Sequence, residues 1–283
     1  MRPVADVLTA LRDAAGPGGG VDNGRVRLRV RFTKVGKVRF TSHRDVARIW
    51  ERALRRVGLP VAYASGFTPR PRLSFGLALP TGYESLGEYL DIELRTDRYR
   101  SGEVMLVGHG DGTILEVAAL RERLDAALPP GFGVDAVEPV EGKVESLQEA
   151  VTACTWRFGI NDLDRDTAAA AVAGLLASSE VVVERERKGT TVVDDVRPAV
   201  HDMSVMAAAS TSAAMPGLGL QATLAAKPRV VRPSELVSAL APGHEMTLAV
   251  RTHQWIERHG QRFEPLPPPP AGRRAPHTLR CAS

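Results

Sequence analysis

The fold is decided by the stretch Arg25-Val-Arg-Leu-Arg-Val-Arg-Phe32, in which arginine and apolar residues alternate. Because successive side chains of a strand point to opposite faces, this alternation predicts a strand with one buried face and one very basic face. Gly36 then permits a turn, and the residues from Ser42 to Val57 show the apolar spacing of an amphipathic helix. Ser42 can cap that helix, and Gly58 can end it. A strand and a helix therefore open the folded part of the chain.

The same two periodicities continue along the chain and predict two runs of elements in the order β-α-β-β-α-β. The first run continues with strands at Val61–Ala64, Leu73–Leu79 and Tyr89–Arg95, a helix at Leu115–Leu128 and a strand at Gly133–Val140. The second run comprises a strand at Cys154–Ile160, a helix at Asp166–Ala177, a hairpin of Val181–Arg187 with Thr191–Arg197, strands at Val200–Ala207 and Leu218–Ala225, a helix from the cap Ser234 to Leu240 and a strand at Met246–Arg251. This order is that of a ferredoxin-like unit, an antiparallel sheet with two helices on one face. The sequence therefore predicts an α+β protein of two tandem ferredoxin-like (βαββαβ) units.

Composition divides the chain into four parts. Residues 1–24 contain Gly-Pro-Gly-Gly-Gly and predict a flexible leader, and residues 260–283 contain a run of prolines and predict a disordered tail. Between them we place the first unit, with the basic surface, at residues 25–141 and a second, decorated unit at residues 142–259. Residues 98–114 fit no element of the first unit.

Several features of the sequence bear on where the protein works. No run of about 18 apolar residues occurs, which predicts that the chain does not cross a membrane. The first residues lack the continuous apolar core of a signal peptide. The two cysteines, Cys154 and Cys281, are far apart, and Cys281 lies in the predicted tail, so a structural disulfide is not expected. This cysteine usage is typical of a reducing compartment and predicts a cytoplasmic protein.

Positive charge is concentrated near the start of the chain. Residues 25–72 contain 14 Lys and Arg and only Asp45 and Glu51 as acidic residues, which gives a net charge of +12. Because the whole chain carries +4, the remainder carries −8. Segregation of this size indicates a polyanionic partner such as RNA. The alternative is a solvated basic face without a partner.

A segment rich in proline and arginine, Tyr63-Ala-Ser-Gly-Phe-Thr-Pro-Arg-Pro-Arg-Leu-Ser-Phe75, is the clearest candidate for binding. Prolines keep it extended, so Arg70 and Arg72 can reach phosphates while Phe67 stacks on a base. The alternative is a stiff connection whose aromatic residues belong to the core. The predicted RNA-binding residues are Arg29, Arg31, Lys34, Arg39, His43, Phe67, Arg70 and Arg72.

Motifs for metals, iron–sulfur clusters and nucleotides are missing: the sequence has no C-x-x-C, no H-E-x-x-H and no G-x-x-x-x-G-K-[ST]. We therefore predict no metal and no cofactor. His43 is the candidate general base, because the start of a helix favours the neutral imidazole that could take a proton from a ribose 2′-hydroxyl. The alternative is a histidine that only hydrogen-bonds near the helix cap, and no catalytic residue is assigned beyond this candidate.

Two acidic residues around Tyr89 and Leu90, namely Glu88 and Asp91, are three positions apart. In a strand they face opposite sides, so they do not predict a site with paired carboxylates. We expect one of them to anchor an arginine of the basic loop.

Five short segments together resemble the radical-SAM-associated (radical-SAM-linked) protein family, most densely over residues 25–95. They are Arg31-Phe-Thr-Lys34, Phe40-Thr-Ser-His-Arg-Asp45, Glu51-Arg-Ala-Leu-Arg-Arg56, Ser65-Gly-Phe-Thr-Pro-Arg-Pro-Arg-Leu-Ser74 and Gly87-Glu-Tyr-Leu-Asp91. The resemblance implies a stand-alone form of a protein that is otherwise fused behind a cobalamin-binding radical SAM enzyme. It also implies genes near a ribonuclease of the E/G type. A separate radical SAM enzyme is therefore an expected partner.

Three functions remain open on the sequence. The first is an accessory protein that binds RNA and presents it to a separate radical SAM enzyme. The second is a metal-independent endoribonuclease with His43 as base, since tandem ferredoxin-like units also look like the Cas6-type RNA-processing enzymes. The third is a protein–protein adaptor. The segregated charge favours the first two, and the lack of an evident general acid favours the first.

Overall fold

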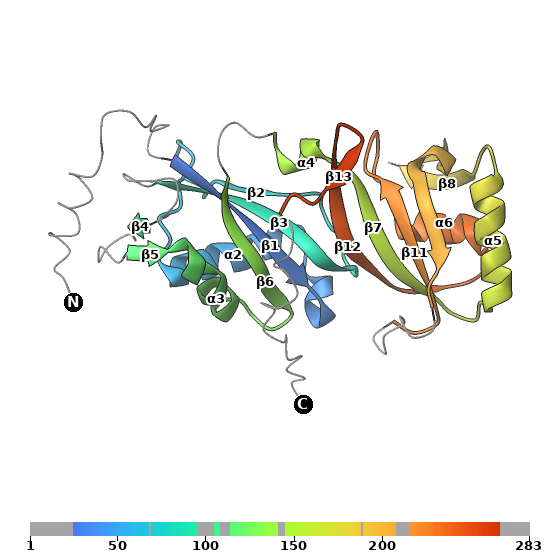
Figure 1. The fold of residues 1–283 in the computed structure, drawn as a ribbon, viewed down its shortest axis with the longest axis horizontal. Helices are drawn as coiled ribbons and strands as arrows, with labels where there is room; N and C mark the ends of the chain where they lie inside the picture. Colours follow the sequence, from blue (N-terminus) through green and yellow to red (C-terminus); the bar gives the residue numbers. More distant parts are fainter. Residues whose placement is uncertain are drawn as a thin grey trace.

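The described elements alternate strands and helices in two successive runs (Figure 1). The computed structural model describes residues 25–67, 69–95, 105–107, 114–140, 145–187, 189–207 and 215–266. The first half contains β1 (Arg25–Lys34), the 3-10 helix η1 (Gly36–Phe40), α2 (His43–Val57), β2 (Leu73–Phe75), β3 (Glu84–Arg95), β4 (Met105–Val107), β5 (Ile114–Glu116), α3 (Val117–Ala127) and β6 (Phe132–Val140). The second half contains α4 (Leu147–Ala150), β7 (Val151–Ile160), α5 (Arg165–Ala177), β8 (Val182–Arg187), β9 (Thr190–Asp195), η2 (Arg197–Ala199), β10 (Val200–Val205), β11 (Leu218–Ala225), α6 (Pro233–Leu240), β12 (Met246–Arg258) and β13 (Gln261–Phe263). The predicted leader at residues 1–24, Cys281 and most of residues 98–114 lie outside the described residues.

Nine of the described strands join into one sheet that runs through both halves of the chain (Figure 1). Its order is β10-β11-β7-β12-β3-β1-β6, with β13 beside β12 and β2 beside β3. The pairs are antiparallel except that of β12 with β3, which run parallel and meet at Val250↔Glu84 and Arg251↔Ser85. The protein is therefore α+β with a mostly antiparallel main sheet, and two hairpins, β4–β5 and β8–β9, stand apart from it.

The main-sheet strands have the same neighbours in both halves. The order is β6-β1-β3-β2 in the first half and β12-β7-β11-β10 in the second. When the four main-sheet strands of each half are numbered in chain order, both halves have the spatial order fourth-first-third-second. The long helices also occupy matching places, because α2 and α5 follow the first strand and α3 and α6 follow the third.

The first core lies between the sheet and the inner faces of α2 and α3. Leu28 of β1, Leu90 of β3 and Leu120 of α3 are fully buried in it, and Phe32 packs edge-on against Trp50 with ring centroids 5.0 Å apart. The apolar stripe predicted for α2 is confirmed by the buried residues Val46, Trp50, Ala53, Leu54 and Val57, with Ile49 packed beside them. Burial of this stripe fixes which side of α2 faces solvent.

The second core lies between α5, α6 and one face of β7 and β11. Trp156 and Phe158 of β7 are buried there with Leu220 of β11, Val172 of α5 and Leu236 of α6. The predicted β8–β9 hairpin is confirmed. None of the described helices combines the length and the apolar character that crossing a membrane requires.

The caps of two helices can be compared with their predictions. The Ser42 hydroxyl accepts a hydrogen bond from the Asp45 amide at 3.2 Å, which confirms the predicted cap of α2. Gly58 ends α2 with φ +78, a left-handed conformation that suits glycine. The cap predicted at Ser234 is wrong, because Pro233 occupies the first turn of α6 and Arg232 is the N-cap, its amide donating to Glu235 at 3.1 Å.

The start of the predicted disordered tail is ordered. Residues 261–263 form β13 and pair with β12, and residues 264–266 contact β1 and β3. The sequence prediction from residue 260 onward is therefore wrong for residues 261–266, and residues 267–283 lie outside the described residues. We call residues 264–266 the strap.

A buried ion pair connects the two halves where β12 meets β3. The Arg251 guanidinium, fully buried on β12, donates to both Glu88 carboxylate oxygens on β3 at 2.7 and 2.8 Å. Both of these bonds come from Nη2 of Arg251, which also donates to the Leu77 carbonyl at 2.7 Å. The Arg251 guanidinium carbon lies 5.4 Å from the Trp156 ring centroid. The backbone pairing here covers two residue pairs, so these side chains supply much of the contact.

We expect Arg251→Met to lower the free energy of unfolding by about 3–5 kcal/mol, because it leaves the Glu88 carboxylate buried without its partner. Arg48→Ala, which removes an exposed pair with Asp45, should cost at most about 1 kcal/mol. Urea denaturation of both variants checks this. Equal losses of unfolding free energy in the two variants would contradict the conclusion that the buried ion pair stabilises the fold more than an exposed pair does.

Candidate nucleic-acid interface

The basic face of β1 is largely buried, and its arginines pair with carboxylates. Arg29 lies opposite Asp91 in the β1–β3 register, and its Nε and Nη2 donate to the two carboxylate oxygens at 2.7 and 2.9 Å. Directly opposite residues of antiparallel strands are close enough for such a pair. The prediction of a basic face open to solvent is therefore wrong at Arg29. The two-residue spacing of Asp91 and Glu93 in β3 is the sequence signal that indicates this pairing.

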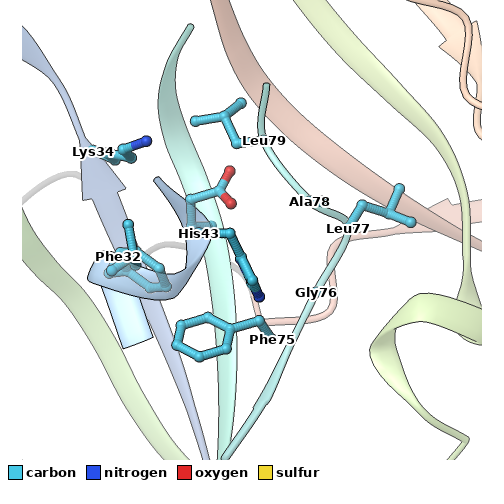
Figure 2. A pocket seen from close by; sticks show the side chains of 10 residues that line it. Phe32, Lys34, His43, Phe75, Gly76, Leu77, Ala78 and Leu79 are labelled. Carbon is cyan, nitrogen blue, oxygen red and sulfur yellow. The ribbon is translucent and has the colours of Figure 1, made fainter. Parts of the chain in front are cut away.

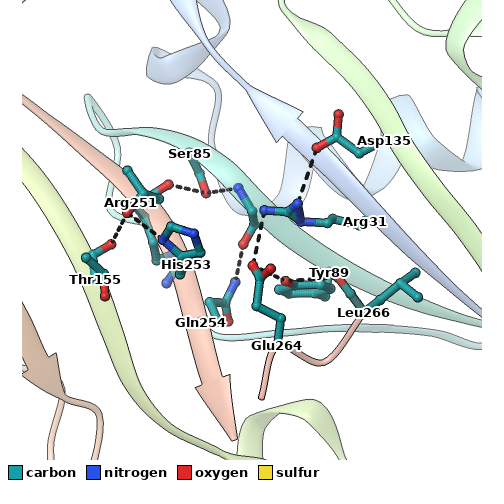
Figure 3. A network of polar contacts seen from close by, with 12 residues as sticks. Arg31, Ser85, Tyr89, Asp135, Thr155, Arg251, His253, Gln254, Glu264 and Leu266 are labelled. Atoms are coloured by element: carbon teal, nitrogen blue, oxygen red, sulfur yellow. Dashed lines mark hydrogen bonds and ion pairs between the residues drawn. The ribbon is translucent and has the colours of Figure 1, made fainter. Parts of the chain in front are cut away.

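The strap covers the next part of that face (Figure 3). Arg31, only 3% exposed, contacts Glu264 at 3.2 Å and Asp135 at 3.8 Å. The Tyr89 hydroxyl donates to Glu264 at 3.2 Å and is 3.4 Å from the Leu266 carbonyl. Burial raises the pKa of Tyr89 far above its ordinary value, and Glu264 adds to the shift. Arg31 is therefore a structural residue here, which the sequence does not reveal because Glu264 is so distant along the chain.

Glu88 and Asp91 face opposite sides of β3, as predicted. Asp91 binds Arg29, and Glu88 binds Arg251 of the second half. The expected anchor of the basic loop is a different residue, because Glu93 contacts Arg72 at 3.4 Å.

Lys34, Arg39 and His43 gather at the start of α2. The Lys34 ammonium is buried and donates to the Thr41 carbonyl at 3.0 Å and to the Arg39 carbonyl at 3.3 Å. Burial lowers the pKa of Lys34, and the nearby Glu88 carboxylate opposes that shift. Arg39 is half-buried, with its guanidinium carbon 4.8 Å from the Phe40 ring centroid and a contact to Glu84 at 3.5 Å.

His43 is exposed and stands beside a narrow pocket (Figure 2). Lys34, Phe75 and Glu88 line the same pocket, and the His43 and Phe75 rings meet edge-on at 5.1 Å. The interior has room for about one water molecule. A substrate could therefore touch His43 at the mouth of the pocket but could not enter it.

The exposed basic surface lies on α2. Its arginines at 44, 48, 52, 55 and 56 are all exposed, and we call Arg44, Arg48, Arg52, Arg55 and Arg56 the α2 arginine stripe. Spacing of three to four residues places side chains on one face of a helix. The stripe was not among the predicted binding residues, although this spacing in the sequence is the signal that identifies it.

Residues 61–67 and 69–72, which overlap the predicted binding segment at residues 63–75, form an irregular hairpin. The Ala64 amide donates to the Arg70 carbonyl at 2.8 Å, and the Arg72 amide donates to the Ala62 carbonyl at 2.8 Å. Phe67 near the tip is fully exposed, and Arg70 is exposed as well. Arg72 is half-buried beside Glu93. We call this segment the 61–72 hairpin.

The structure thus divides the eight predicted residues into three groups. Lys34, Arg39 and His43 lie near the start of α2, whereas Phe67, Arg70 and Arg72 belong to the hairpin that follows its end. The helix between them is about 22 Å long at 1.5 Å per residue. Arg29 and Arg31 point to the other face of the sheet, because the alternate residues Leu28 and Val30 belong to the core under α2.

A titratable group of the second half lies in the network around Arg31 (Figure 3). His253 of β12 is half-buried, and its Nδ1 is 3.0 Å from the Thr252 hydroxyl. Burial lowers the pKa of His253, and the positive charges of Arg31 and Arg157 lower it further. Within the described residues, no group of three or more His, Cys, Asp or Glu is arranged to hold a metal ion.

We expect the stability of the fold to fall with acidification below about pH 6.5, and to fall less steeply in His253→Gln. The unfolded chain binds a proton at His253 near its ordinary pKa of 6.5, whereas the folded chain binds it only at lower pH, so acid favours unfolding. His201, whose pKa is also lowered, acts with the same sign and remains in the variant. Urea midpoints between about pH 5 and 7.5 measure the slope, and parallel wild-type and variant slopes would count against this assignment.

Comparison with known proteins places the chain in a family. A family described as an uncharacterised protein conserved in bacteria (DUF2344) matches residues 27–233. No curated protein matches the chain. The family description names no radical SAM enzyme, so that part of the resemblance stays a prediction. The match spans most of both halves, and the chain therefore belongs to the bacterial family DUF2344.

Proposed function

We propose that the protein binds RNA through the α2 arginine stripe and the 61–72 hairpin and presents it to a separate radical SAM enzyme. The observation that carries the RNA proposal is the arginine stripe. Much of the positive charge of residues 25–72 is paired internally, as at Arg29 with Asp91 and at Arg31 with Glu264. The five arginines of the stripe stay exposed, and among them Arg48 contacts a carboxylate at 3.1 Å. Exposed arginines on one rigid element are suited to phosphate contacts.

Exposed aromatic residues flank the stripe at both ends. Phe40 precedes α2 and is 62% exposed, and Tyr63 and Phe67 follow it in the hairpin. Aromatic rings beside a basic surface are typical of proteins that bind single-stranded RNA, because bases stack on them. A strand of RNA lying along α2 would meet an aromatic side chain at either end.

The architecture supports a further part of the proposal, namely that the two halves are tandem ferredoxin-like units. Both halves share the fourth-first-third-second strand order and the positions of the long helices. The β8–β9 hairpin is then an insertion in the second unit. Ferredoxin-like units occur in many RNA-binding proteins, which is an analogy of fold and carries no activity by itself.

The proposal includes a partner enzyme because residues 25–95 resemble the radical-SAM-associated family. The α2 surface would hold the RNA, and other parts of the molecule would be left for the enzyme.

We expect RNA affinity to fall steeply with salt, and Arg52→Ala, Arg55→Ala and Arg70→Ala each to reduce the log–log slope by about one, because each removes one phosphate contact. The measurement is fluorescence anisotropy of a labelled single-stranded RNA at several salt concentrations. Arg258→Ala is the matched control, since Arg258 is an exposed arginine at the end of β12. Binding that is insensitive to salt, or that Arg258→Ala weakens equally, would reject the α2 surface.

One observation favours a second candidate function, a metal-independent endoribonuclease. His43 shares its pocket with Lys34 and Glu88, so a possible base stands near an ammonium group that could stabilise charge (Figure 2). The Lys34 ammonium is buried and already donates to two carbonyls, which leaves it poorly placed to donate to a substrate.

We expect purified protein to leave RNA intact in EDTA, because the described residues place no accessible general acid beside His43. A single acid or base group raises the rate only roughly 10²–10⁴-fold. The assay incubates total small RNA with the wild-type protein and with His43→Ala, and maps the ends of the products. Cleavage at specific sites that disappears in His43→Ala would promote the ribonuclease to first place.

A further inference from the structure

Two aromatic side chains of β12 stack on the face of the sheet that α5 and α6 do not cover. The rings of His253 and Trp255 lie with centroids 5.0 Å apart and an interplanar angle of 10°. Trp255 donates to the hydroxyl of Thr155, which alternates along β7 with Cys154 and Trp156 of the helix-covered core. Because neighbouring residues of a strand face opposite sides, Thr155 and the rings belong to the other face. We call His253 and Trp255 the β12 ring pair.

Hydrogen bonds fix the orientation of both rings. The Trp255 Nε1 group donates to the Thr155 hydroxyl at 2.8 Å, and that hydroxyl is 2.9 Å from the hydroxyl of Thr223 on β11. The His253 Nδ1 atom is 3.0 Å from the Thr252 hydroxyl. The ring pair is therefore held rigidly before any ligand arrives, which reduces the entropy lost on binding.

Core packing does not account for the ring pair. Both rings are half-buried, and neither belongs to an apolar cluster of the described residues. The cluster on this part of β12 consists of Met215, Leu248 and Val250. An aromatic pair on a polar sheet surface, outside every core, is the arrangement that binding proteins use to receive a planar ligand.

An arginine of β7 lies beside the ring pair. Arg157 lies two residues along β7 from Thr155 on the same face, about 7 Å away at 3.3 Å per residue. Burial lowers the pKa of His253, and the charges of Arg31 and Arg157 lower it further, so the imidazole is neutral near pH 7. Arg157 Nε also donates to the Gln221 side-chain oxygen at 3.0 Å. The planar polar groups of these two side chains therefore lie together near the rings.

We propose that the β12 ring pair is a stacking site for a nucleobase, with Arg157 placed to meet the attached phosphate. The chemistry shared by possible ligands is a planar base joined to a phosphate, supplied by a free nucleotide or by single-stranded RNA. With RNA as the source, the inference rests on the proposed function and adds a second contact surface on the other side of the sheet from α2. With a free nucleotide as the source, it stands by itself.

The tryptophans of the chain make this site directly observable. Of its three tryptophans, Trp50 and Trp156 are 0% and 1% exposed, so Trp255 is the tryptophan on which a base added in solution can stack. The experiment titrates wild-type protein with adenosine monophosphate and, separately, with single-stranded oligoadenylate, and records tryptophan fluorescence. Anisotropy of a labelled oligoadenylate measures binding independently in parallel.

We expect quenching in the wild-type protein and none in Trp255→Phe, which keeps an aromatic ring and binds within a few-fold of wild type. Trp255→Leu should bind the oligonucleotide roughly five- to a hundred-fold more weakly, the loss typical of one stacked base. Phe263→Leu is the matched control, because Phe263 is an exposed aromatic residue of β13 outside the ring pair. If Trp255→Leu does not fold, His253→Gln replaces it and should also weaken binding.

The outcomes separate the two proposals. Quenching by the nucleotide or by the oligonucleotide that is lost with Trp255 supports the stacking site. An oligonucleotide that binds by anisotropy with unchanged wild-type fluorescence overturns the stacking site and leaves the α2 surface standing. If neither ligand quenches the fluorescence and the labelled oligonucleotide does not bind by anisotropy, the stacking site and the proposed RNA binding are overturned together.

Discussion

The structure depends on one buried ion pair, that of Arg251 with Glu88. A carboxylate taken out of water is costly unless a cation and hydrogen bonds replace its hydration, and Arg251 supplies both. The backbone contributes two parallel residue pairs at the same place, so side chains supply much of the contact at this junction. The ion pair lies where the pairing of β12 with β3 joins the strands of both halves into one sheet.

A second consequence of charge pairing concerns which arginines are available to a partner. Asp91, Asp135 and Glu264 neutralise the arginines on one face of β1, while α2 carries its arginines on the side away from its buried stripe. The same composition therefore serves two purposes. On β1 the arginines bind carboxylates of β3 and of the strap, and on α2 they form a charged surface that is exposed to water. Net charge alone does not distinguish these uses, since both contribute equally to it.

Much of the fold could be predicted from the sequence because its signals are local. The alternation at residues 25–32, the cap Ser42 and the terminator Gly58 all act within a few residues, and they place β1 and α2 correctly. The candidate site was harder to predict. Alternation shows that Arg29 and Arg31 share a face, but what covers that face depends on Glu264, far away in the chain. Pocket neighbours such as His43 and Glu88 are likewise joined only by tertiary packing.

The pairing of Arg29 with Asp91 has a consequence for sequence tolerance. Two parallel hydrogen bonds to one carboxylate require the planar fork of a guanidinium, which the single ammonium of lysine cannot reproduce. The same holds for Arg251, whose Nε and Nη2 donate to the two carboxylate oxygens of Glu88 at 3.1 and 2.8 Å. The described contacts of the exposed α2 arginines include no such pair of bonds to one carboxylate, so replacing them by lysine costs the fold little. Exchange of arginine for lysine is therefore conservative on the helix surface and disruptive inside the sheet, although the residue type is the same.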